Sequence, residues 1–377
     1  MSFTENLLAW GRLHGRTDLP WQQKTKGSLN VYWVWVSEVM LQQTQVQTVR
    51  NYFLAFVRRF PNRASLAHAP LDDVLAAWSG LGYYRRARNL HAAACLLERH
   101  YPAGGWPQTR QAWQDLPGIG RSTAAAIVSS CFQAREPILD GNVKRVLARQ
   151  VCAEQSWGSA ALDRLLWEEA ERRLPAKATD MPLYTQSLMD LGATLCLPKR
   201  PDCGRCPVRK DCQAHSKGES LNFPRPKPSK VRPVRKEHWL VCLRSERLKA
   251  SARSGSSSRF QLALQQQSEQ GVWAGLWTFP ALDAEVSLPK GWVQWMAFHH
   301  DFSHFRLLVS LWVPSWFIQN RADQPAGSLL VNDDAAGDAR LFTAQTLSYR
   351  PVSDWLEQGI PSPVRRVLEK LAKAFEA

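Results

Sequence analysis

Two carboxylates in unlike surroundings are the residues of this sequence best suited to catalysis. Glu38 lies among the apolar residues Val36, Val39 and Met40. A carboxyl group there loses hydration, which raises its pKa and suits it to donate a proton at neutral pH. Asp140 directly precedes Gly-Asn-Val-Lys-Arg-Val-Leu, where an aspartate is typical of a helix N-cap. A solvated glutamate and a capping aspartate are the simpler interpretations, so a catalytic role depends on the neighbouring motifs.

The stretch before the aspartate predicts two helices joined by a tight turn. Leu116 and Pro117 end one helical run, Gly118 and Gly120 permit the turn, and an alanine-rich run of high helix propensity follows Arg121. The first amide N–H groups of the second helix are bare, and neither glycine has a side chain that would hold a phosphodiester away. We therefore expect an anion site at this turn.

The glutamate is predicted to lie on a helical stretch. Apolar residues recur at helical spacing from Val34 to Phe60, leaving Glu38, Gln42 and Gln43 among the polar members. Residues 71–78 predict a short amphipathic helix, and glycines, tyrosines and arginines alternate in residues 79–88. Charges that pair with phosphates beside a wedging ring would open a duplex, although a glycine turn packed by two core tyrosines explains the same residues.

Four of the eight cysteines are crowded into one short segment. They follow the pattern Cys196-x6-Cys203-x2-Cys206-x5-Cys212. This spacing is typical of a metal site in a reducing compartment and not of a disulfide framework. Four thiolates hold structural zinc or an iron–sulfur cluster equally well, so their chemistry alone leaves both open.

Length and charge restrict the class of protein. The 377 residues favour two domains, and the net charge of +15 favours a polyanionic partner, nucleic acid or an anionic membrane surface. The absence of an apolar run of about 20 residues argues against a membrane span. The first residues also lack a basic start followed by a long apolar core, so we expect a soluble, cytoplasmic, nucleoid-associated protein.

A change of composition predicts the domain boundary. Residues 199–236 hold twelve Lys or Arg against three Asp or Glu, together with several prolines, which predicts an extended basic linker. Beyond it, residues 239–243, 260–264 and 305–313 read as strands, and residues 361–377 read as a closing amphipathic helix.

Several of these motifs together resemble one family. Leu-Pro-Gly-Ile-Gly joined to Leu-Asp-Gly-Asn-Val-Lys-Arg-Val closely resembles the helix-hairpin-helix, iron–sulfur, endonuclease III-like DNA glycosylases. Val-Ser-Glu-Val-Met-Leu-Gln-Gln-Thr-Gln-Val resembles the branch that excises adenine mispaired with 8-oxoguanine. The resemblance implies that Glu38 protonates adenine and that Asp140 faces the sugar. Residues 21–34 run a few residues longer than the family pattern, so no adenine contact is assigned there.

The resemblance also implies roles for further residues. Gln186 and Ser122 are assigned to adenine binding. Because Ser122 stands where bifunctional relatives carry a lysine that forms a Schiff base, we expect base removal without efficient strand scission. Contacts with DNA are assigned to Gln43, Tyr83, Gly118, Gly120 and Lys144.

The carboxyl-terminal half carries the remaining resemblance. Residues 271–280 resemble the Nudix-like domain of the same glycosylases, and the paired glutamates that a Nudix hydrolase needs for magnesium are missing from the residues that follow. Phe302, Ser303 and His304 match the loop that distinguishes 8-oxoguanine from guanine. The cysteine spacing matches the family's [4Fe–4S] loop, which favours iron over zinc.

The sequence therefore predicts a multidomain protein. An all-α helix-hairpin-helix domain over residues 1–222 carries the [4Fe–4S] loop, residues 223–236 form the linker, and residues 237–377 form a Nudix-like α+β domain. The predicted protein is a monomeric, monofunctional glycosylase acting on double-stranded DNA with adenine opposite 8-oxoguanine or guanine. The alternatives are a bifunctional lyase for oxidised pyrimidines and a non-catalytic DNA-binding protein with a zinc module.

Overall fold

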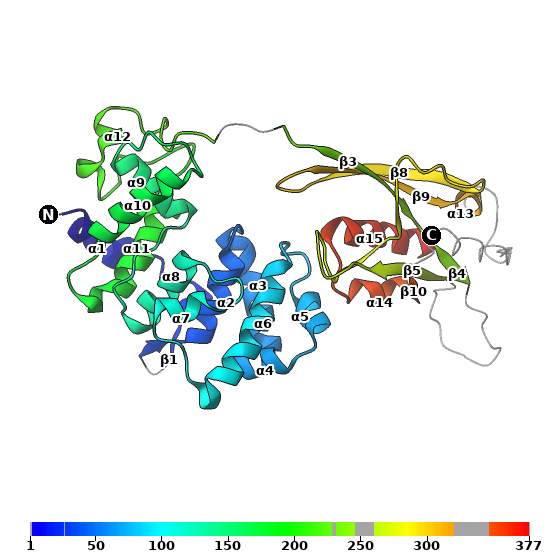
Figure 1. The fold of residues 1–377 in the computed structure, drawn as a ribbon, viewed down its shortest axis with the longest axis horizontal. Coiled ribbons are helices and arrows are strands. Elements are labelled where there is room, and N and C mark those ends of the chain that lie inside the picture. Colours follow the sequence, from blue (N-terminus) through cyan, green and yellow to red (C-terminus); the bar gives the residue numbers. More distant parts are fainter. Residues whose placement is uncertain (1, 26, 228–230, 246–259, 320–346, 377) are drawn as a thin grey trace. The chain divides into compact units, whose positions relative to one another are not determined.

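The computed structural model describes residues 2–25, 27–227, 231–245, 260–319 and 347–376, and these form two compact units. Unit 1 comprises residues 1–69 and 86–229, and unit 2 comprises residues 70–85 and 230–377. The short segment 70–85 therefore groups with the carboxyl-terminal half, whereas the chain on either side of it belongs to unit 1. Figure 1 shows the helices of the first unit and the sheets of the second.

Unit 1 is helical, in agreement with the sequence. Its helices are α1 (Phe3–His14), α2 (Val31–Leu41), α3 (Val46–Arg59), α4 (Arg63–His68), α6 (Arg85–His100), α7 (Arg110–Gln114), α8 (Arg121–Phe132), α9 (Gly141–Gln150), α10 (Ala160–Arg172), α11 (Met181–Thr194) and α12 (Gln213–Ser216). Short 3₁₀ turns are η1 (Pro20–Gln22), η2 (Pro102–Gly104), η3 (Ala178–Asp180) and η4 (Arg209–Asp211), and β1 (Lys24–Thr25) pairs with β2 (Ser28–Leu29).

The predicted continuous helical stretch from Val34 to Phe60 is wrong in one respect. The chain leaves the helix after Leu41 and re-enters it at Val46, because Gln43 adopts a left-handed backbone with φ 58°. That conformation ends an α-helix, and apolar periodicity alone does not reveal it.

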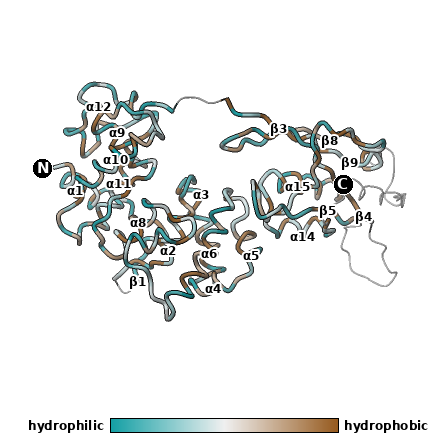
Figure 2. Tube along the Cα trace, in the orientation of Figure 1, coloured by the Kyte–Doolittle hydropathy of each residue, from teal (hydrophilic) through white to brown (hydrophobic). Residues whose placement is uncertain are grey.

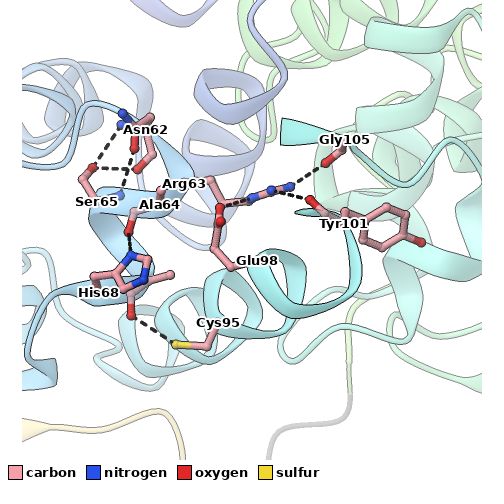
Figure 3. Close-up of polar contacts among 10 residues, drawn as sticks. Asn62, Arg63, Ala64, Ser65, His68, Cys95, Glu98, Tyr101 and Gly105 are labelled. Atoms are coloured by element: carbon pink, nitrogen blue, oxygen red, sulfur yellow. Dashed lines mark hydrogen bonds and ion pairs between the residues drawn. The ribbon is translucent and has the colours of Figure 1, made fainter. Parts of the chain in front are cut away.

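Buried polar bonds and close backbone approaches fix the packing of unit 1. The buried Arg63 of α4 donates to Glu98 of α6 at 2.5 Å, and its other nitrogens donate to the carbonyls of Tyr101 and Gly105 (Figure 3). Gly192 of α11 faces Asn142, where an added Cβ would lie 2.7 Å from the asparagine Cβ. The missing side chain therefore lets α9 and α11 approach each other, which matters because both carry predicted site residues.

Unit 2 is built from two four-stranded sheets and helices. The strands are β3 (Val234–Leu240), β4 (Leu243–Ser245), β5 (Phe260–Gln266), β6 (Trp277–Thr278), β7 (Ala281–Asp283), β8 (Trp292–Asp301), β9 (Arg306–Pro314) and β10 (Leu347–Arg350). The helices are α5 (Leu71–Ala77), α13 (Ser315–Gln319), α14 (Val352–Leu356) and α15 (Ser362–Glu376). One sheet has the order β7-β3-β9-β8, with β3 and β9 parallel, and the other has the order β10-β5-β4 with β6 beside β5.

The predicted strands of unit 2 shift at their ends. The stretch 239–243 spans the end of β3 and the start of β4, with the break at Val241 and Cys242, and the third strand begins at Arg306, one residue after the predicted start. Leu368 and Leu371 of α15 are fully buried in the unit's core, as the amphipathic pattern predicted.

The predicted linker, residues 223–236, includes a buried residue at its start and the first residues of a strand at its end. Phe223 is buried beside Cys152 and Cys212, and Arg225 pairs with Glu154 at 2.8 Å. Val234 already begins β3. The many prolines and charged residues around Phe223 and Val234 favoured the prediction of a linker, so neither the buried ring nor the start of the strand was predicted.

Hydrophobic and hydrophilic residues alternate along the chain (Figure 2). Among the described residues, no helix combines the length and the apolar character that crossing a bilayer requires.

Candidate active site and recognition loop

The helix of Glu38 places its carboxyl group in a dehydrating environment. Asn30 caps α2 by accepting a hydrogen bond from Trp33 N at 3.3 Å, and the helix is apolar on most of its surface. Burial is the main cause that raises the pKa of Glu38 to about 8, and the negative charge of Asp140 adds to it. Glu38 therefore holds a proton at neutral pH, as the sequence predicted.

Asp140 is the N-cap of α9, in agreement with the sequence. Its Oδ1 accepts the N–H of Val143 at 2.7 Å. Burial raises its pKa, while the N–H groups of Val143 and Asn142 and the charge of Arg145 act in the opposite direction. Because these donors favour the ionised form, Asp140 is the better carrier of the negative charge and Glu38 the better carrier of the proton. The two predicted carboxylates thus interact in one site.

Ser122 connects the hairpin to the aspartate. Its Oγ accepts the N–H of Leu139 at 2.9 Å, so α8 is bonded to the residue that precedes Asp140. Gly118 has φ 77°, and an added Cβ would lie 2.7 Å from Asn89. Gly120 is the N-cap of α8, forms no side-chain cap, and would leave an added Cβ without neighbours within 4 Å. The turn is therefore closed on the side of Gly118 and open at the helix start, as an anion site requires.

Gln186 is held by a carboxylate that the sequence interpretation missed. Its Nε2 donates to Oδ1 of Asp190 at 2.6 Å, one helical turn further along α11. Asp190 is fully buried and pairs with the guanidinium of Arg16 at 2.7 Å. The i, i+4 spacing of Gln186 and Asp190 was the available signal.

Two arginines also support the site without having been predicted. The buried Arg86 donates from Nη1 to the carbonyls of Met40 at 2.6 Å and Gln42 at 2.5 Å, which caps the end of the glutamate's helix. Arg149 of α9 is 2% exposed and donates to the Cys196 sulfur at 3.2 Å and to the carbonyls of Leu197 and Pro198. One helix therefore carries the aspartate at its start and holds the cysteine loop near its end.

The four predicted metal ligands line one cavity. Cys196, Cys203, Cys206 and Cys212 face it together with Arg149, Val208 and His215. Burial raises the pKa of Cys206 to about 12, and the three other thiolates act in the same direction. Within the described ranges no three or more His, Cys, Asp or Glu side chains are placed so that together they could hold a metal ion.

Two predicted DNA contacts share an unusual backbone. Gln43 and Tyr83 are both exposed, and both have left-handed backbones with φ of 58° and 50°. Non-glycine residues rarely adopt this conformation, which is concentrated at functional sites. Gln43 lies in unit 1 and Tyr83 in unit 2.

Lys144 is engaged within the protein. Its Nζ lies 2.6 Å from Oδ1 of Asp163 on α10. On the same helix, the ring of Trp167 lies 3.9 Å from the guanidinium of Arg121. The assignment of Lys144 to a phosphate contact stays a prediction, and binding would compete with this ion pair.

The predicted recognition loop is the turn of the hairpin between β8 and β9 in unit 2. Asp301 and Arg306 form the last pair of the ladder and are joined by a two-bond ion pair at 2.6 and 2.9 Å. Ser303 and His304 are exposed at the tip. The Phe302 ring stacks on Phe305 at 4.4 Å, and Phe302 N donates to Phe305 O at 2.9 Å.

A second layer of aromatic rings supports this loop. Trp273 has φ 60°, and its ring centroid lies 5.0 Å from that of Phe302. The ring centroid of His300 lies 4.7 Å from that of Phe302. The polar tip is therefore exposed to solvent on a packed aromatic base, which suits a group that reads the edge of a ligand.

Comparison with known proteins places these features in a family context. The model of the HhH-GPD superfamily of base excision DNA repair proteins matches residues 36–172. The adenine DNA glycosylase of Buchnera aphidicola subsp. Baizongia pistaciae is 32% identical over 382 residues, which cover 98% of this chain and 97% of the relative. The adenine DNA glycosylase of Homo sapiens is 34% identical over 333 residues, covering 76% of this chain and 58% of the human protein.

Two solved structures also match part of the chain. A thermostable thymine-DNA glycosylase has a TM-score of 0.48 and 25% identity, covering 57% of this chain and 95% of its own. A non-covalent endonuclease III–DNA complex has a TM-score of 0.47 and 20% identity, covering 58% and 99%.

Proposed function

Because the chain belongs to the adenine DNA glycosylases, within the HhH-GPD superfamily of base excision DNA repair proteins, we propose that it hydrolyses the N-glycosidic bond of adenine in DNA. The family that the sequence motifs predicted is thereby confirmed. The preferred substrate in this proposal is double-stranded DNA with adenine opposite 8-oxoguanine, or opposite guanine, and the adenine nucleotide leaves the base stack to enter the site.

Glu38 supplies the proton that makes adenine a good leaving group. Its pKa of about 8 keeps the carboxyl group protonated at neutral pH, so it donates to the purine ring as the glycosidic bond breaks. Gln186 holds the base in this scheme. One N–H of its amide is bonded to Asp190, which fixes the side chain and leaves the amide oxygen able to accept a hydrogen bond from the exocyclic amine of adenine.

Asp140 stabilises the positive charge that develops on the sugar. Its carboxylate is fixed by the N–H of Val143, so it is in place before the bond breaks and does not have to reorient. Water then replaces the base at the sugar carbon, and the products are free adenine and an abasic site.

Ser122 directs the reaction towards hydrolysis without strand cleavage. A hydroxyl group cannot form the imine by which an amine at this hairpin position would lead to strand cleavage. The hydroxyl is also engaged with the N–H of Leu139. The nearest alternative amine in the sequence, Lys144, is paired with Asp163.

The remaining assignments concern DNA and the lesion. Gln43 and Tyr83 enter the stack, the hairpin at Gly118 and Gly120 binds a phosphate, and Ser303 bonds the altered edge of 8-oxoguanine between Phe302 and His304. Exposure of Gln43, Tyr83, Ser303 and His304 supports these roles. The two sheets of unit 2 are compatible with the proposed Nudix-like domain.

The four cysteines suit a [4Fe–4S] cluster. Their sulfurs face one cavity, and four thiolates are the usual ligands of such a cluster. In this proposal Cys196, Cys203, Cys206 and Cys212 hold the cluster, which stabilises the loop against α9 through Arg149. Metal analysis that finds zinc alone, with no visible iron–sulfur absorption, would contradict it.

The observation that carries the proposed function is the interaction of a protonated Glu38 with a capped Asp140 in one site. The test uses duplexes with adenine opposite 8-oxoguanine, guanine, cytosine or thymine, each sample being divided into heated alkali and no alkali. We expect alkali-dependent nicking at adenine that is fastest opposite 8-oxoguanine. Strong cleavage before alkali would favour the bifunctional lyase, and no base release from any duplex would favour a non-catalytic DNA-binding protein.

A further inference from the structure

The turn that carries Tyr83 is a structural part of the unit that carries the recognition loop. Residues 70–85 cluster with residues 230–377, although the chain before and after this segment belongs to unit 1. Side-chain hydrogen bonds join the segment to Ile360, before α15, and to Arg365 of α15 itself.

The turn after α5 is closed by a side-chain hydrogen bond and has a left-handed backbone at three positions. Trp78 is fully buried, and its indole Nε1 donates to Gly82 O at 3.1 Å. Gly80 and Gly82 have φ of 93° and 74°, and Tyr83 follows with φ 50°. Tyr83 is 53% exposed, so a residue with a left-handed backbone presents a half-exposed ring at a closed turn.

Tyr84 joins this turn to the connection before α15. Its side chain is buried, and its hydroxyl donates to the carbonyl of Ile360 at 2.6 Å while accepting the N–H of Gly80 at 3.3 Å. Ile360 is fully buried. A buried carbonyl and a turn amide are thus bonded to the same hydroxyl, and replacing it leaves both with a lost partner.

Ser79 and Arg365 form a second connection at the same place. Ser79 Oγ donates to Ile360 O at 3.3 Å. Nη2 of Arg365, on α15, donates to Ser79 Oγ at 3.0 Å and to Leu356 O at 2.8 Å. The guanidinium therefore links α15, the end of α14 and the turn.

The apolar contact at this connection leaves no spare room. A Cβ added to Gly359 would lie 3.0 Å from Leu75 Cβ and 3.4 Å from Leu276 Cδ2. The carbonyl of Gly359 accepts the N–H of Trp277 at 3.1 Å. Trp277 ends the same glycine-rich segment that contains Trp273, the ring beneath Phe302. A continuous packed path therefore leads from the Tyr83 turn to the recognition loop.

We propose that Tyr84, with Ser79 and Arg365, is a positioning group that holds the Tyr83 turn in register with the Phe302–His304 loop, so that insertion of Tyr83 and reading of 8-oxoguanine occur together. This inference rests on the proposed function and adds a specificity determinant to it. Tyr84 touches no reacting atom in this account. Its effect falls on the preference for 8-oxoguanine over guanine and not on the chemical step.

The test is Tyr84→Phe, which removes one oxygen and keeps the ring. Single-turnover rates of adenine release are measured on duplexes with adenine opposite 8-oxoguanine and opposite guanine. We expect the ratio of the two rates to fall about tenfold, with the rate opposite guanine within about twofold of wild type. An unchanged ratio would overturn the proposal.

A matched control separates positioning from stability. Tyr32 is also buried, and its hydroxyl donates to a backbone carbonyl, that of Phe60, at 2.7 Å, but it lies in unit 1. Tyr32→Phe should lower thermal stability to a similar extent and leave the ratio at the wild-type value. A fall of the ratio in the control as large as in Tyr84→Phe would assign the effect to stability and overturn the proposal.

Two further variants test the same coupling. Gly359→Ala should press on Leu75 and lower the same ratio without touching a hydrogen bond. Ser303→Ala should lower the ratio less in the Tyr84→Phe background than in wild type, because the loop and the turn then no longer act together. Additive effects of the two substitutions would contradict the coupling.

The outcomes distinguish this inference from the function on which it rests. If wild type releases no adenine from either duplex, the proposed function fails. If wild type prefers 8-oxoguanine and Tyr84→Phe keeps that preference, the proposed function stands and only the positioning role fails.

Discussion

The carboxylate site of unit 1 and the β8–β9 loop of unit 2 differ in how far their polar groups are exposed to water. Glu38 and Asp140 are held in dehydrated surroundings, where burial and a neighbouring charge set their protonation. Ser303 and His304 are exposed at the tip of a hairpin, and only the aromatic base beneath them is packed. The difference follows from the tasks, since proton donation needs a shifted pKa whereas recognition needs an accessible donor on a rigid base.

The largest expected effect is a loss of adenine release when the proton donor of the carboxylate site is removed. Glu38→Gln keeps the shape of the side chain and removes the proton donor, so we expect adenine release to fall by about 10³-fold in single-turnover assays. Glu98→Gln is the control, because Glu98 pairs with Arg63 and, among the described residues, forms no hydrogen bond or ion pair with Glu38 or Asp140, so the change should affect stability alone. Full base release by the Glu38 variant would remove the acid from the mechanism.

Two substitutions of Asp140 distinguish the catalytic effect of its charge from the stabilising effect of its helix cap. Asp140→Asn should lower the rate by about 10²-fold or more, because the negative charge is lost, while asparagine still caps α9. Asp140→Ala should lower the rate similarly and also lower the free energy of unfolding by about 1 kcal/mol. Ser159→Ala, which removes the cap of α10, should cause the second effect without the first. Equal stability of the two Asp140 variants would contradict the capping role.

In the recognition loop a smaller, selective effect is expected. Ser303→Ala should reduce the preference for 8-oxoguanine over guanine by about tenfold, because one hydrogen bond to the lesion is lost, and should leave the rate opposite guanine unchanged. The two rates are measured on otherwise identical duplexes. A parallel fall of both rates would indicate that the loop supports folding or general DNA binding instead.

Glu38 should also make the free energy of unfolding depend on pH. Its pKa is raised in the folded protein from the ordinary 4.5 to about 8, so the folded state binds more protons than the unfolded state within that range. This favourable contribution is present at low pH and is lost as the pH rises through the range. The free energy of unfolding of Glu38→Gln relative to wild type should therefore increase by up to a few kcal/mol from about pH 5 to about pH 8. A difference that is constant with pH would contradict the raised pKa of Glu38.

Local sequence pattern was sufficient to predict much of the helical structure of unit 1 and, to within a few residues, the strands and the last helix of unit 2. The N-cap of Asp140 and the hairpin at Gly118 and Gly120 follow from short-range preferences that the structure realises. The break at Gln43 escaped prediction because its left-handed backbone opposes the apolar periodicity around it. The carboxylate of Asp190 behind Gln186 was overlooked although its spacing was available.

Long-range contacts could not be read from the sequence at all. The grouping of residues 70–85 with the carboxyl-terminal half depends on hydrogen bonds such as that from Tyr84 to Ile360, which no local pattern predicts. The same holds for Arg86, which lies in the stretch 79–88 where arginines were expected to pair with phosphates, and for Arg149. Both guanidinium groups bond backbone carbonyls inside the protein. Charge pattern alone does not distinguish an arginine that binds phosphate from one that binds backbone carbonyls.

The most direct test of the account is the pH dependence of single-turnover adenine release from the duplex with 8-oxoguanine. A protonated Glu38 with a pKa of about 8 predicts a rate that is retained at neutral pH and falls as the pH rises through about 8, with the slope of one proton. The residual rate of Glu38→Gln should show no such fall. The range from about pH 7 to about pH 9 brackets that pKa. A wild-type rate that stays level or rises over this range would contradict the central claim that Glu38 is the acid.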